Sequence, residues 1–409
     1  MLWILYEFVM RLIAMIASAA GLFSKKLALR NHGLNHQKIP QLRESIWIHA
    51  ASLGEFEQGK SIIDGLRRQY PDRIMVLTFF SSSGFEKRKD YPAVDHVFYL
   101  PYDRFRSMQK FVDRINPDLV IIIKYEFWFN WLRIMKQRGI SYMFISALFR
   151  PDQFFFKNGF TKIRTLLQDA ERIFVQNEPS ARLLSRFHFQ NVTVAGDTRV
   201  DRTIEITQED FRSLVIERWL RDRFCVIAGS SWPPEEKWLA QCYDLFPDWR
   251  WIIAPHEVHS SHIFDIKKLF GEDALTLTEA EKILDEGRSI DDVPVLIIDR
   301  IGLLSRLYRY GNIALIGGGM GAGIHNTLEP AAYGLPVIFG KKYKKFQEAV
   351  DFIEVGAAQS IGSENELVAA LRFLSPAEVR ENIRLQLKHY FEKQSGATNL
   401  ILQQIKNIL

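Results

Sequence analysis

The run Leu119-Val120-Ile121-Ile122-Ile123 is apolar at every position and rich in β-branched residues. Such residues favour a β-strand, and a strand without polar positions has both faces covered, as in a parallel sheet between two layers of helices. The preceding stretch Asp103–Ile115 has apolar residues at helical spacing. The run therefore predicts an α/β domain with a doubly wound sheet.

The same alternation of strand and helix continues through both halves of the chain. In the first half the predicted strands are Ile46–Ala50, Arg73–Phe80, His96–Leu100, Leu119–Lys124, Ser141–Ser146, Arg172–Gln176 and Val192–Ala195. After a charged stretch without strand signals, strands resume at Phe224–Ala228, Trp251–Ala254, Pro294–Ile298, Ile313–Ile316 and Pro336–Phe339. A chain of 409 residues exceeds one hydrophobic core. We predict two Rossmann-like domains, residues 24–200 and 223–409, joined by a linker over 201–222 and facing a central cleft.

The first 23 residues form a separate apolar segment. Met1–Phe23 carries only two charges, Glu7 and Arg11, which lie four residues apart and can pair on one helix face. As a helix the segment is ~34 Å long, enough to cross a bilayer. Its longest uncharged stretch, Leu12–Phe23, is too short to span alone, so spanning and lying in the membrane interface both stay open.

A cleaved secretory signal and a buried core helix are the other interpretations of this segment. Ser18-Ala19-Ala20 resembles the cleavage site of a secretory signal, but no basic residue precedes the apolar stretch and Lys25 and Lys26 follow it. By the positive-inside rule this charge pattern keeps the following chain in the cytoplasm. A buried core helix is disfavoured by the basic linker Ser24–Arg43. We expect residues 1–23 to be a retained membrane anchor.

Charge and cysteine content exclude some classes of protein. The 53 Lys and Arg exceed the 48 Asp and Glu by only five, too few to indicate nucleic-acid binding but compatible with an anionic membrane or a phosphorylated substrate. The two cysteines, Cys225 and Cys242, suggest neither a disulfide framework nor a cysteine metal site.

Two carboxylates follow strands in the first half. Glu55 comes after the strand ending at Ala50, at the start of a helix, and can act as a general base in a cleft. Spacing alone favours a different interpretation, in which Ser52-x-x-Glu55 is a capping box that serves stability only. Glu126 follows the Leu119–Lys124 strand within a dense aromatic group, and its alternatives are a second site carboxylate or the start of a helix over a core cluster.

In the second half, glycine-rich and polar residues follow the strands. The cluster Gly317–Gly323 precedes a helix start at Asn326–Glu329, which suggests a seat for a nucleotide phosphate, although the loop lacks the P-loop ending. Gly229-Ser230-Ser231 and Pro255-His256 lie at two further strand ends. The histidines at 256, 259 and 262 lack a His-Glu-x-x-His element, so we expect no metal site.

Three motifs in order resemble those of the bacterial 3-deoxy-D-manno-octulosonic acid (Kdo) transferases specific for lipid A. The family pattern His-Ala-x-Ser-x-Gly-Glu is met by His49–Glu55, Glu-x-Trp-x-Asn by Glu126–Asn130, and His-Asn-x-Leu-Glu-Pro-Ala by His325–Ala331. The N-terminal anchor fits the same family. The resemblance extends over nearly the whole chain.

The resemblance implies a GT-B glycosyltransferase that needs no cofactor or metal and moves Kdo from CMP-Kdo to a glucosamine hydroxyl of the lipid A precursor (lipid IVA), with inversion. It implies the inner membrane, at its cytoplasmic face, as the location and no nucleic-acid partner. Glu55 matches the catalytic base, with Glu126 as a secondary candidate. The CMP contacts it implies are Ser230, Ser231, Pro255, His256, Ile301, Gly302, Leu303, Asn326, Thr327, Leu328 and Glu329. Candidate cations for the phosphate are Arg199, Arg202 and the lysines at 341, 342, 344 and 345. The lysine run is equally a solvated turn after the Pro336–Phe339 strand, so it stays outside the set of expected contacts.

The chain departs from the family pattern at four places. One is Arg199, where the family usually has a Lys near the domain junction, and the other three lie in the second half of the chain. Pro255-His256-Glu257 stands where the family has Pro-Arg-His, Ile301-Gly302-Leu303 where it has Met-Gly-Glu, and Trp232 where a His usually follows Gly-Ser-Ser. These departures keep two alternatives open. One is another GT-B transferase or an epimerase that uses a UDP-sugar, and the other is a membrane-attached binding protein that has lost catalysis.

Overall fold

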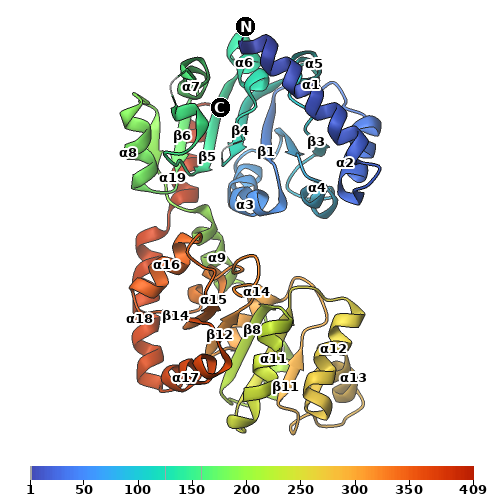
Figure 1. Cartoon of the computed structure of the whole chain (residues 1–409), viewed down its shortest axis with the longest axis vertical. Helices are drawn as coiled ribbons and strands as arrows, with labels where there is room; N and C mark the ends of the chain where they lie inside the picture. Colours follow the sequence, from blue (N-terminus) through green and yellow to red (C-terminus); the bar gives the residue numbers. More distant parts are fainter. Residues whose placement is uncertain (1, 125, 158) are drawn as a thin grey trace. The chain divides into compact units, whose positions relative to one another are not determined.

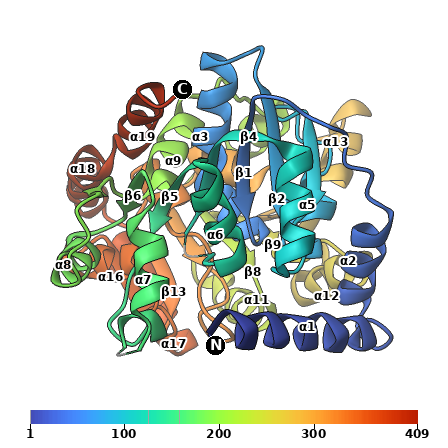
Figure 2. The ribbon, with the colours of Figure 1, turned by 90° about the horizontal axis from the view of Figure 1, so that it is seen from above.

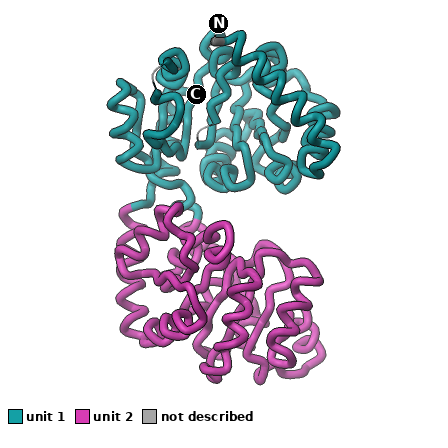
Figure 3. Tube along the Cα trace, in the orientation of Figure 1, with its two compact units in different colours: residues 1–202, 394–409 teal, residues 203–393 magenta. Residues whose placement is uncertain are grey.

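The computed structural model describes residues 2–124, 126–157 and 159–409. The chain divides into two compact units (Figure 3), the first made of residues up to 202 together with 394–409, and the second of Thr203–Lys393. Each unit is an α/β layer structure around its own sheet (Figure 1).

The sheet of the first unit has seven parallel strands in the order β3-β2-β1-β4-β5-β6-β7. The strands are β1 (Ser45–Ala50), β2 (Ile74–Phe79), β3 (His96–Tyr99), β4 (Pro117–Ile123), β5 (Ser141–Ala147), β6 (Arg172–Val175) and β7 (Val192–Val194). The helices of this part of the chain are α1 (Leu2–Ala20), α2 (Lys25–His36), α3 (Leu53–Gln69), α4 (Ser82–Arg88), α5 (Phe105–Ile115), α6 (Phe129–Arg138), η1 (Phe154–Phe156), α7 (Thr161–Gln168), α8 (Glu178–Arg186) and α9 (Thr198–Gln208), with α19 (Ala397–Lys406) added from the C-terminus.

Both faces of this sheet are buried, as its apolar strands predict. Along β1, Trp47 joins one core cluster, while its neighbours Ile46 and Ile48 join the other. The first cluster includes residues of α5, α6 and α7, and the second includes residues of α3 and α19. This explains why β4 needs an unbroken apolar run, since each side chain from Leu119 to Ile123 is inaccessible to solvent.

The sheet of the second unit also has seven parallel strands, in the order β10-β11-β9-β8-β12-β13-β14. The strands are β8 (Cys225–Ser231), β9 (Arg250–Pro255), β10 (Ala274–Thr276), β11 (Val295–Ile297), β12 (Ile313–Ile316), β13 (Val337–Gly340) and β14 (Ala358–Ile361). The helices are α10 (Leu214–Leu220), α11 (Pro233–Cys242), η2 (Tyr243–Leu245), α12 (Ser260–Phe270), η3 (Gly271–Asp273), α13 (Leu277–Asp285), α14 (Leu304–Leu307), η4 (Tyr308–Tyr310), α15 (Leu328–Ala332), α16 (Gln347–Glu354), α17 (Glu364–Leu374) and α18 (Ala377–Gln394).

The predicted α/β class and the two Rossmann-like sheets are confirmed, but two strands were missed. β10 and β14 are the edge strands of the second sheet. β10 has only three residues, and β14 has the polar pair Gln359 and Ser360 at its centre. An edge strand is covered on fewer sides than a central one, so its sequence carries a weaker apolar signal.

The units also end elsewhere than the predicted domains. The predicted second domain ran to residue 409, whereas α19 packs in the first unit. Its buried residues Ile401, Leu402 and Ile405 belong to the same core cluster as those of α3, and a Cβ at Gly65 of α3 would lie 2.4 Å from a methyl carbon of Leu402. The last helix of the chain thus completes the core of the first unit.

Candidate functional site

The first candidate site lies where β1 and β4 end. The two strands are neighbours in the sheet and run parallel, so the residues that follow them emerge at the same edge. Glu55 follows β1 by way of a tight turn into α3, and Glu126 follows β4.

The Glu55 carboxylate is fixed by the turn that carries it. Its Oε2 accepts a hydrogen bond from the Ala51 N–H at 2.6 Å, and its own N–H donates to Ser52 Oγ at 3.4 Å. Ser52 therefore caps the N-terminus of α3, and the Glu55 carboxylate accepts from the Ala51 backbone rather than from that of Ser52. Its Oε1 accepts no hydrogen bond from any described residue. Half-burial raises the pKa of Glu55, against the opposing effects of the Ala51 N–H and the positive charge of Lys124.

The Glu126 carboxylate is half-buried and electrostatically coupled to Glu55. Trp128 Nε1 donates to Glu126 Oε2 at 3.0 Å. Burial, followed by the negative charge of Glu55, raises the pKa of Glu126 to about 7. Two carboxylates that influence one another at a sheet edge are a pattern typical of acid–base sites. Tyr125, which the sequence motif includes, lies outside the described residues.

The first residue of the first motif, His49, and the last residue of the second, Asn130, have structural roles. His49 is fully buried, its Nδ1 lies 2.9 Å from Thr78 Oγ1, and burial lowers its pKa to about 3, so the ring stays neutral. Asn130 is also buried, and its Nδ2 donates to the Asp103 backbone oxygen at 2.6 Å.

Asp103 is a buried carboxylate that sequence reasoning missed. It accepts hydrogen bonds from the N–H groups of Asn130 (2.8 Å) and Trp131 (2.9 Å) at the start of α6, and from the Tyr6 hydroxyl at 2.7 Å. Burial raises its pKa to about 7 despite these donors. No local pattern reveals it, because Tyr6 lies 97 residues away in the chain.

A second candidate site lies at the ends of β9, β8 and β12, which are adjacent in the second sheet. There the rings of Trp232, His256 and His325 stack. Trp232 and His256 lie 4.9 Å apart at 24°, and His256 and His325 lie 4.2 Å apart at 21°. Two of the four places where the sequence departs from the family pattern, at Trp232 and His256, thus contact each other.

The stack fixes the protonation of His325. Trp232 Nε1 donates to His325 Nε2 at 2.9 Å, and an indole nitrogen is a donor only. Nε2 therefore carries no proton, and the hydrogen of the neutral ring lies on Nδ1. Burial, followed by the neighbouring His256, lowers the pKa of His325 to about 4, in agreement with the neutral form.

A cavity of about 320 Å³ lies beside this stack, lined by Trp232, Pro233, Pro234, Glu235, Gly318, Met320, Gly321, Ala322, Gly323 and His325. The Glu235 side chain is buried, and its Oε1 accepts the Gly318 N–H at 3.0 Å. Burial raises the pKa of Glu235, while the backbone N–H groups around it act in the opposite direction. Glu235 thus ties the glycine-rich loop to the start of α11.

Crowding within the second unit accounts for two glycines of that loop. A Cβ on Gly317 would lie 2.1 Å from the Ser230 backbone oxygen, and one on Gly319 would lie 2.5 Å from the backbone of Gly340. Both positions therefore exclude any side chain for packing reasons, whereas a Cβ on Gly321 would make only an ordinary contact, 3.7 Å from the Gly318 backbone oxygen. The sequence interpretation, in which the glycines admit a ligand, fits Gly321 better than these two.

The predicted CMP contacts from the third motif lie in a short structured turn. Asn326 Nδ2 donates to Glu329 Oε1 at 2.9 Å, and Asn326 Oδ1 accepts the Leu328 N–H at 3.1 Å. Thr327 and Leu328 are buried, and no described residue is a hydrogen-bond partner of Thr327 Oγ1. The helix that begins here, α15, has only five residues.

The remaining predicted contacts differ in how accessible they are. Ser231 is buried and donates to Glu236 Oε1 at 2.8 Å, so its hydroxyl is already used. Ser230 adopts a left-handed backbone conformation (φ 51°), and Pro255 is buried at the end of β9. Ile301 is 83% exposed and precedes Gly302 (φ 92°) and Leu303, the N-cap of α14.

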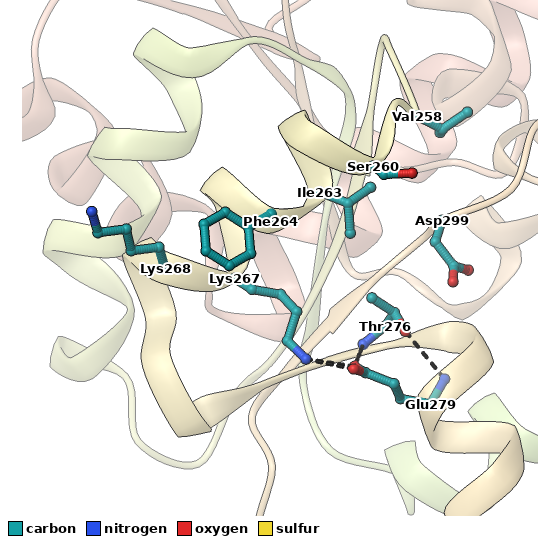
Figure 4. A pocket seen from close by; sticks show the side chains of 9 residues that line it. All are labelled: Val258, Ser260, Ile263, Phe264, Lys267, Lys268, Thr276, Glu279 and Asp299. Atoms are coloured by element: carbon teal, nitrogen blue, oxygen red, sulfur yellow. Dashed lines mark hydrogen bonds and ion pairs between the residues drawn. The ribbon is translucent and has the colours of Figure 1, made fainter.

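A larger cavity of about 640 Å³ lies close in the chain to the predicted CMP contacts at 255–256 and 301–303 (Figure 4). It is lined by Val258, Ser260, Ile263, Phe264, Lys267, Lys268, Thr276, Glu279 and Asp299. Lys267 Nζ forms an ion pair with Glu279 at 2.6 Å, and Glu279 also closes a capping box with Thr276. Asp299, just after β11, is a lining carboxylate that sequence reasoning did not select.

Several cations named from the sequence already have partners. Arg199 forms an ion pair with Asp197, and Lys341 forms one with Glu366 at 2.9 Å. Within residues 2–124, 126–157 and 159–409, no group of three or more His, Cys, Asp or Glu side chains is placed to hold a metal ion. One helix of this part of the chain, over Trp3–Ala20, is long and apolar enough to cross a membrane.

Comparison with known proteins connects these sites to a family. The family model described as 3-Deoxy-D-manno-octulosonic-acid transferase (kdotransferase) matches residues 23–202. A 3-deoxy-D-manno-octulosonic acid transferase of Aquifex aeolicus is 25% identical over 364 residues, which cover 86% of this chain and 91% of that protein. One of Haemophilus influenzae is 25% identical over 389 residues, which cover 90% of this chain and 87% of that protein. The chain is thus similar to Kdo transferases over most of its length.

These matches support a glycosyltransferase, as the three motifs predicted. Solved structures agree on the fold. Acinetobacter baumannii MurG has a TM-score of 0.56 at 11% identity, covering 90% of this chain and 100% of that one. A Neisseria meningitidis UDP-GlcNAc 2-epimerase bound to UDP-GlcNAc has a TM-score of 0.59 at 13% identity, again covering 90% and 100%. The predicted GT-B type of fold is thereby confirmed.

Proposed function

We propose that this Kdo transferase moves Kdo from CMP-Kdo to a glucosamine hydroxyl of a lipid A precursor, with inversion and without a metal ion. The similarity to Kdo transferases supports the class of reaction. The observation that carries the mechanism is the coupled pair Glu55 and Glu126 at the ends of the neighbouring strands β1 and β4. In this proposal the acceptor binds the first unit and CMP-Kdo binds the second.

Glu55 is the general base of the proposed step. Its Oε1 takes the proton of the acceptor hydroxyl while the hydroxyl oxygen attacks the anomeric carbon of Kdo. The bond between that carbon and the phosphate oxygen breaks, and its electron pair leaves with CMP. A single displacement inverts the anomeric centre. A pKa raised by burial makes the Glu55 carboxylate a stronger base than an exposed glutamate, and general bases contribute about 10²–10⁴-fold to a rate.

Glu126 is the second carboxylate of the pair. Because its pKa is about 7, it is partly protonated at neutral pH while it lies within electrostatic range of Glu55. Its ionised form strengthens the affinity of Glu55 for a proton, since like charges disfavour each other. Lys124 acts on Glu55 in the opposite direction. We assign Glu126 the role of tuning the base.

CMP is held, in this proposal, by the residues that the family motifs select in the second unit. These are Ser230, Ser231, Pro255, His256, Ile301, Gly302, Leu303, Asn326, Thr327, Leu328 and Glu329. The leaving group is a nucleoside monophosphate, which carries less charge than a diphosphate. Backbone N–H groups near Asn326 and nearby cations can then stabilise it without a divalent ion.

The proposed location is the cytoplasmic face of the inner membrane, with α1 as the attachment. The helix over Trp3–Ala20 is apolar, and Lys25 and Lys26 follow it. An acceptor with acyl chains stays in the bilayer, so an enzyme confined to the same surface meets it at a higher effective concentration.

The test is incubation of detergent-solubilised protein with CMP-Kdo and the tetraacylated lipid A precursor, with mass spectrometry of the lipid. We expect the mass of the lipid to increase by Kdo units. Glu55→Gln should lower the rate by about 10²-fold or more and leave CMP binding intact, because the amide keeps an oxygen for the Ala51 N–H but takes up no proton. Glu57→Gln is the matched control, since Glu57 lies on the same helix and pairs with Arg88 at 2.8 Å.

Three outcomes would contradict the proposal. Full activity of Glu55→Gln would exclude it as the base, and parallel loss of CMP binding would make its role structural. Stabilisation against heat by UDP rather than CMP would favour a UDP-sugar enzyme. Binding of CMP-Kdo without any transfer by the unaltered protein would favour a binding protein.

A further inference from the structure

The helix α1 packs along the first unit over its whole length. Its less exposed positions recur every three or four residues, the spacing of a single helix face. They are Trp3, Tyr6, Glu7, Met10, Ala14, Ala17 and Ala20, and Gly21 directly after the helix continues them. In Figures 1 and 2 the helix lies along the outside of the first unit, next to α2. At ~1.5 Å per residue this packed face extends over ~27 Å.

Polar bonds fasten this face at both ends. The Tyr6 hydroxyl donates to buried Asp103 at 2.7 Å. Glu7 Oε2 accepts the Phe105 N–H at 2.9 Å and the Asn130 side-chain amide at 3.2 Å. Near the other end, Asn31 Nδ2 donates to the Ala17 backbone oxygen at 3.0 Å. A helix that turned away to cross a bilayer would lose these bonds and carry Glu7 into hydrocarbon.

The opposite face of α1 is a continuous apolar surface. Within Trp3–Ala20 only Met10 is buried, and Arg11 is the only exposed charge. The large apolar side chains on this face are between 40% and 77% exposed: Ile4, Leu5, Phe8, Val9, Leu12, Ile13, Met15 and Ile16. An exposed apolar helix face of this kind marks contact with another apolar phase.

A groove of about 390 Å³ runs beside the N-terminal half of α1, lined by Trp3, Ile4, Glu7, Phe8, Arg11, Phe105, Asn130 and Arg133. The Arg133 guanidinium lies 5.3 Å from the ring centre of Trp3 and 5.1 Å from that of Phe105. It forms no ion pair with any described residue, and Arg104 and Arg106 are exposed at the start of α5. A half-buried guanidinium between rings, next to an apolar surface, matches the phosphate of an anionic lipid.

We propose that α1 does not span the membrane but lies in its plane, with its apolar face in the lipid and the Arg133 groove on an anionic phospholipid headgroup. The inference rests on the membrane attachment included in the proposed function. It decides between the two orientations that the sequence left open. The bonds at Tyr6 and Glu7 then hold the first unit against the bilayer surface.

The orientation is tested by the side on which the N-terminus lies. A cysteine is added before Met1, and intact cells are treated with a membrane-impermeant maleimide before and after they are opened. Cys225 and Cys242 are buried and give no background. We expect labelling only in opened cells, because an in-plane helix keeps both of its ends on the cytoplasmic side. Labelling in intact cells would show that α1 spans and overturn the proposal.

The lipid contacts are tested by flotation with vesicles of phosphatidylcholine alone or mixed with phosphatidylglycerol. Phe8→Asp should reduce binding to both kinds at least tenfold, and Phe373→Asp, at a similarly exposed phenylalanine of the second unit, should not. Arg133→Gln should remove most of the preference for anionic vesicles, and Arg133→Lys should restore part of it. An unchanged preference in Arg133→Gln would refute the headgroup site.

The unaltered protein in detergent separates this inference from the proposed function. If it transfers no Kdo while the labelling and flotation results hold, the proposed function fails and the in-plane helix stands. If it transfers Kdo while intact cells are labelled, the reverse is true.

Discussion

Replacing Glu126 by Gln should make the first unit more stable at alkaline pH. Burial and the charge of Glu55 raise the pKa of Glu126 from the ordinary 4.5 to about 7. In the unfolded chain the proton leaves near pH 4.5, and in the folded chain near pH 7. Between these values the folded state binds more protons than the unfolded state, so its stability falls as the pH rises through this window and is constant above it.

The size of the effect follows from the pKa. At about 1.4 kcal/mol for each pH unit, the rise from 4.5 to about 7 costs the folded state about 3 kcal/mol once Glu126 is ionised. A glutamine carries no charge and avoids this cost, while its amide oxygen can still accept from Trp128. Glu126→Gln should therefore be more stable than the unaltered protein by up to about 3 kcal/mol near pH 8, with no difference near pH 4.

The assay is hydrogen exchange of peptides from β1 and β4, followed by mass spectrometry. It reports on the first unit alone, which matters because a chain with two units need not unfold in one step. Glu171→Gln, at an exposed glutamate of the same unit, is the control and should give no pH-dependent difference. Equal protection of Glu126→Gln and the unaltered protein at both pH values would refute the raised pKa and the coupling to Glu55 on which the proposed base rests.

Three further predictions concern the second unit and the reaction. Trp232→Phe keeps an aromatic ring in the stack but removes the donor to His325 Nε2, so the pKa of His325 should rise from about 4, as NMR of the ring protons would show; an unchanged pKa would contradict the assigned tautomer. Gly319→Ala places a Cβ 2.5 Å from the Gly340 backbone and should destabilise the second unit by about 3 kcal/mol, as thermal unfolding would show. Gly321→Ala, whose Cβ would make only an ordinary contact at 3.7 Å from the Gly318 backbone oxygen, should not. Removal of divalent ions with a chelator should leave the rate of Kdo transfer unchanged, and loss of activity that Mg²⁺ restores would exclude the metal-independent reaction.

The sequence predicted the central strands and the strand ends because those features are local. The run at Leu119 shows its two buried faces directly, and Glu55 follows β1 within a few residues. The sequence did not show that β1 and β4 are neighbours, and this adjacency is what couples Glu126 to Glu55. A contact made through the order of strands in a sheet leaves no trace in the spacing of residues.

The sequence also did not reveal the side-chain contacts between residues that lie far apart in the chain. Tyr6 meets Asp103, Leu402 packs on α3, and Trp232 meets His325, each pair separated by more than 90 residues. Nothing in the sequence around Tyr6 or Leu402 indicates these contacts. Trp232 and His256 differ, because both depart from the family pattern, and this marked the two positions as altered before the structure showed them in contact.

A raised pKa alone does not separate the proposed base from a structural carboxylate. Asp103 and Glu126 both have a pKa of about 7, yet their oxygens differ in what they bind. Asp103 accepts from three donors and so has the partners that a buried carboxylate needs in order to hold a helix end. Glu55 and Glu126 each accept from one donor among the described residues, and each keeps an oxygen that no described residue engages. These unengaged carboxylate oxygens, rather than the pKa, support the proposed role of the pair at β1 and β4. Glu55→Gln should accordingly lower the pKa of Glu126 and leave that of Asp103 where it is.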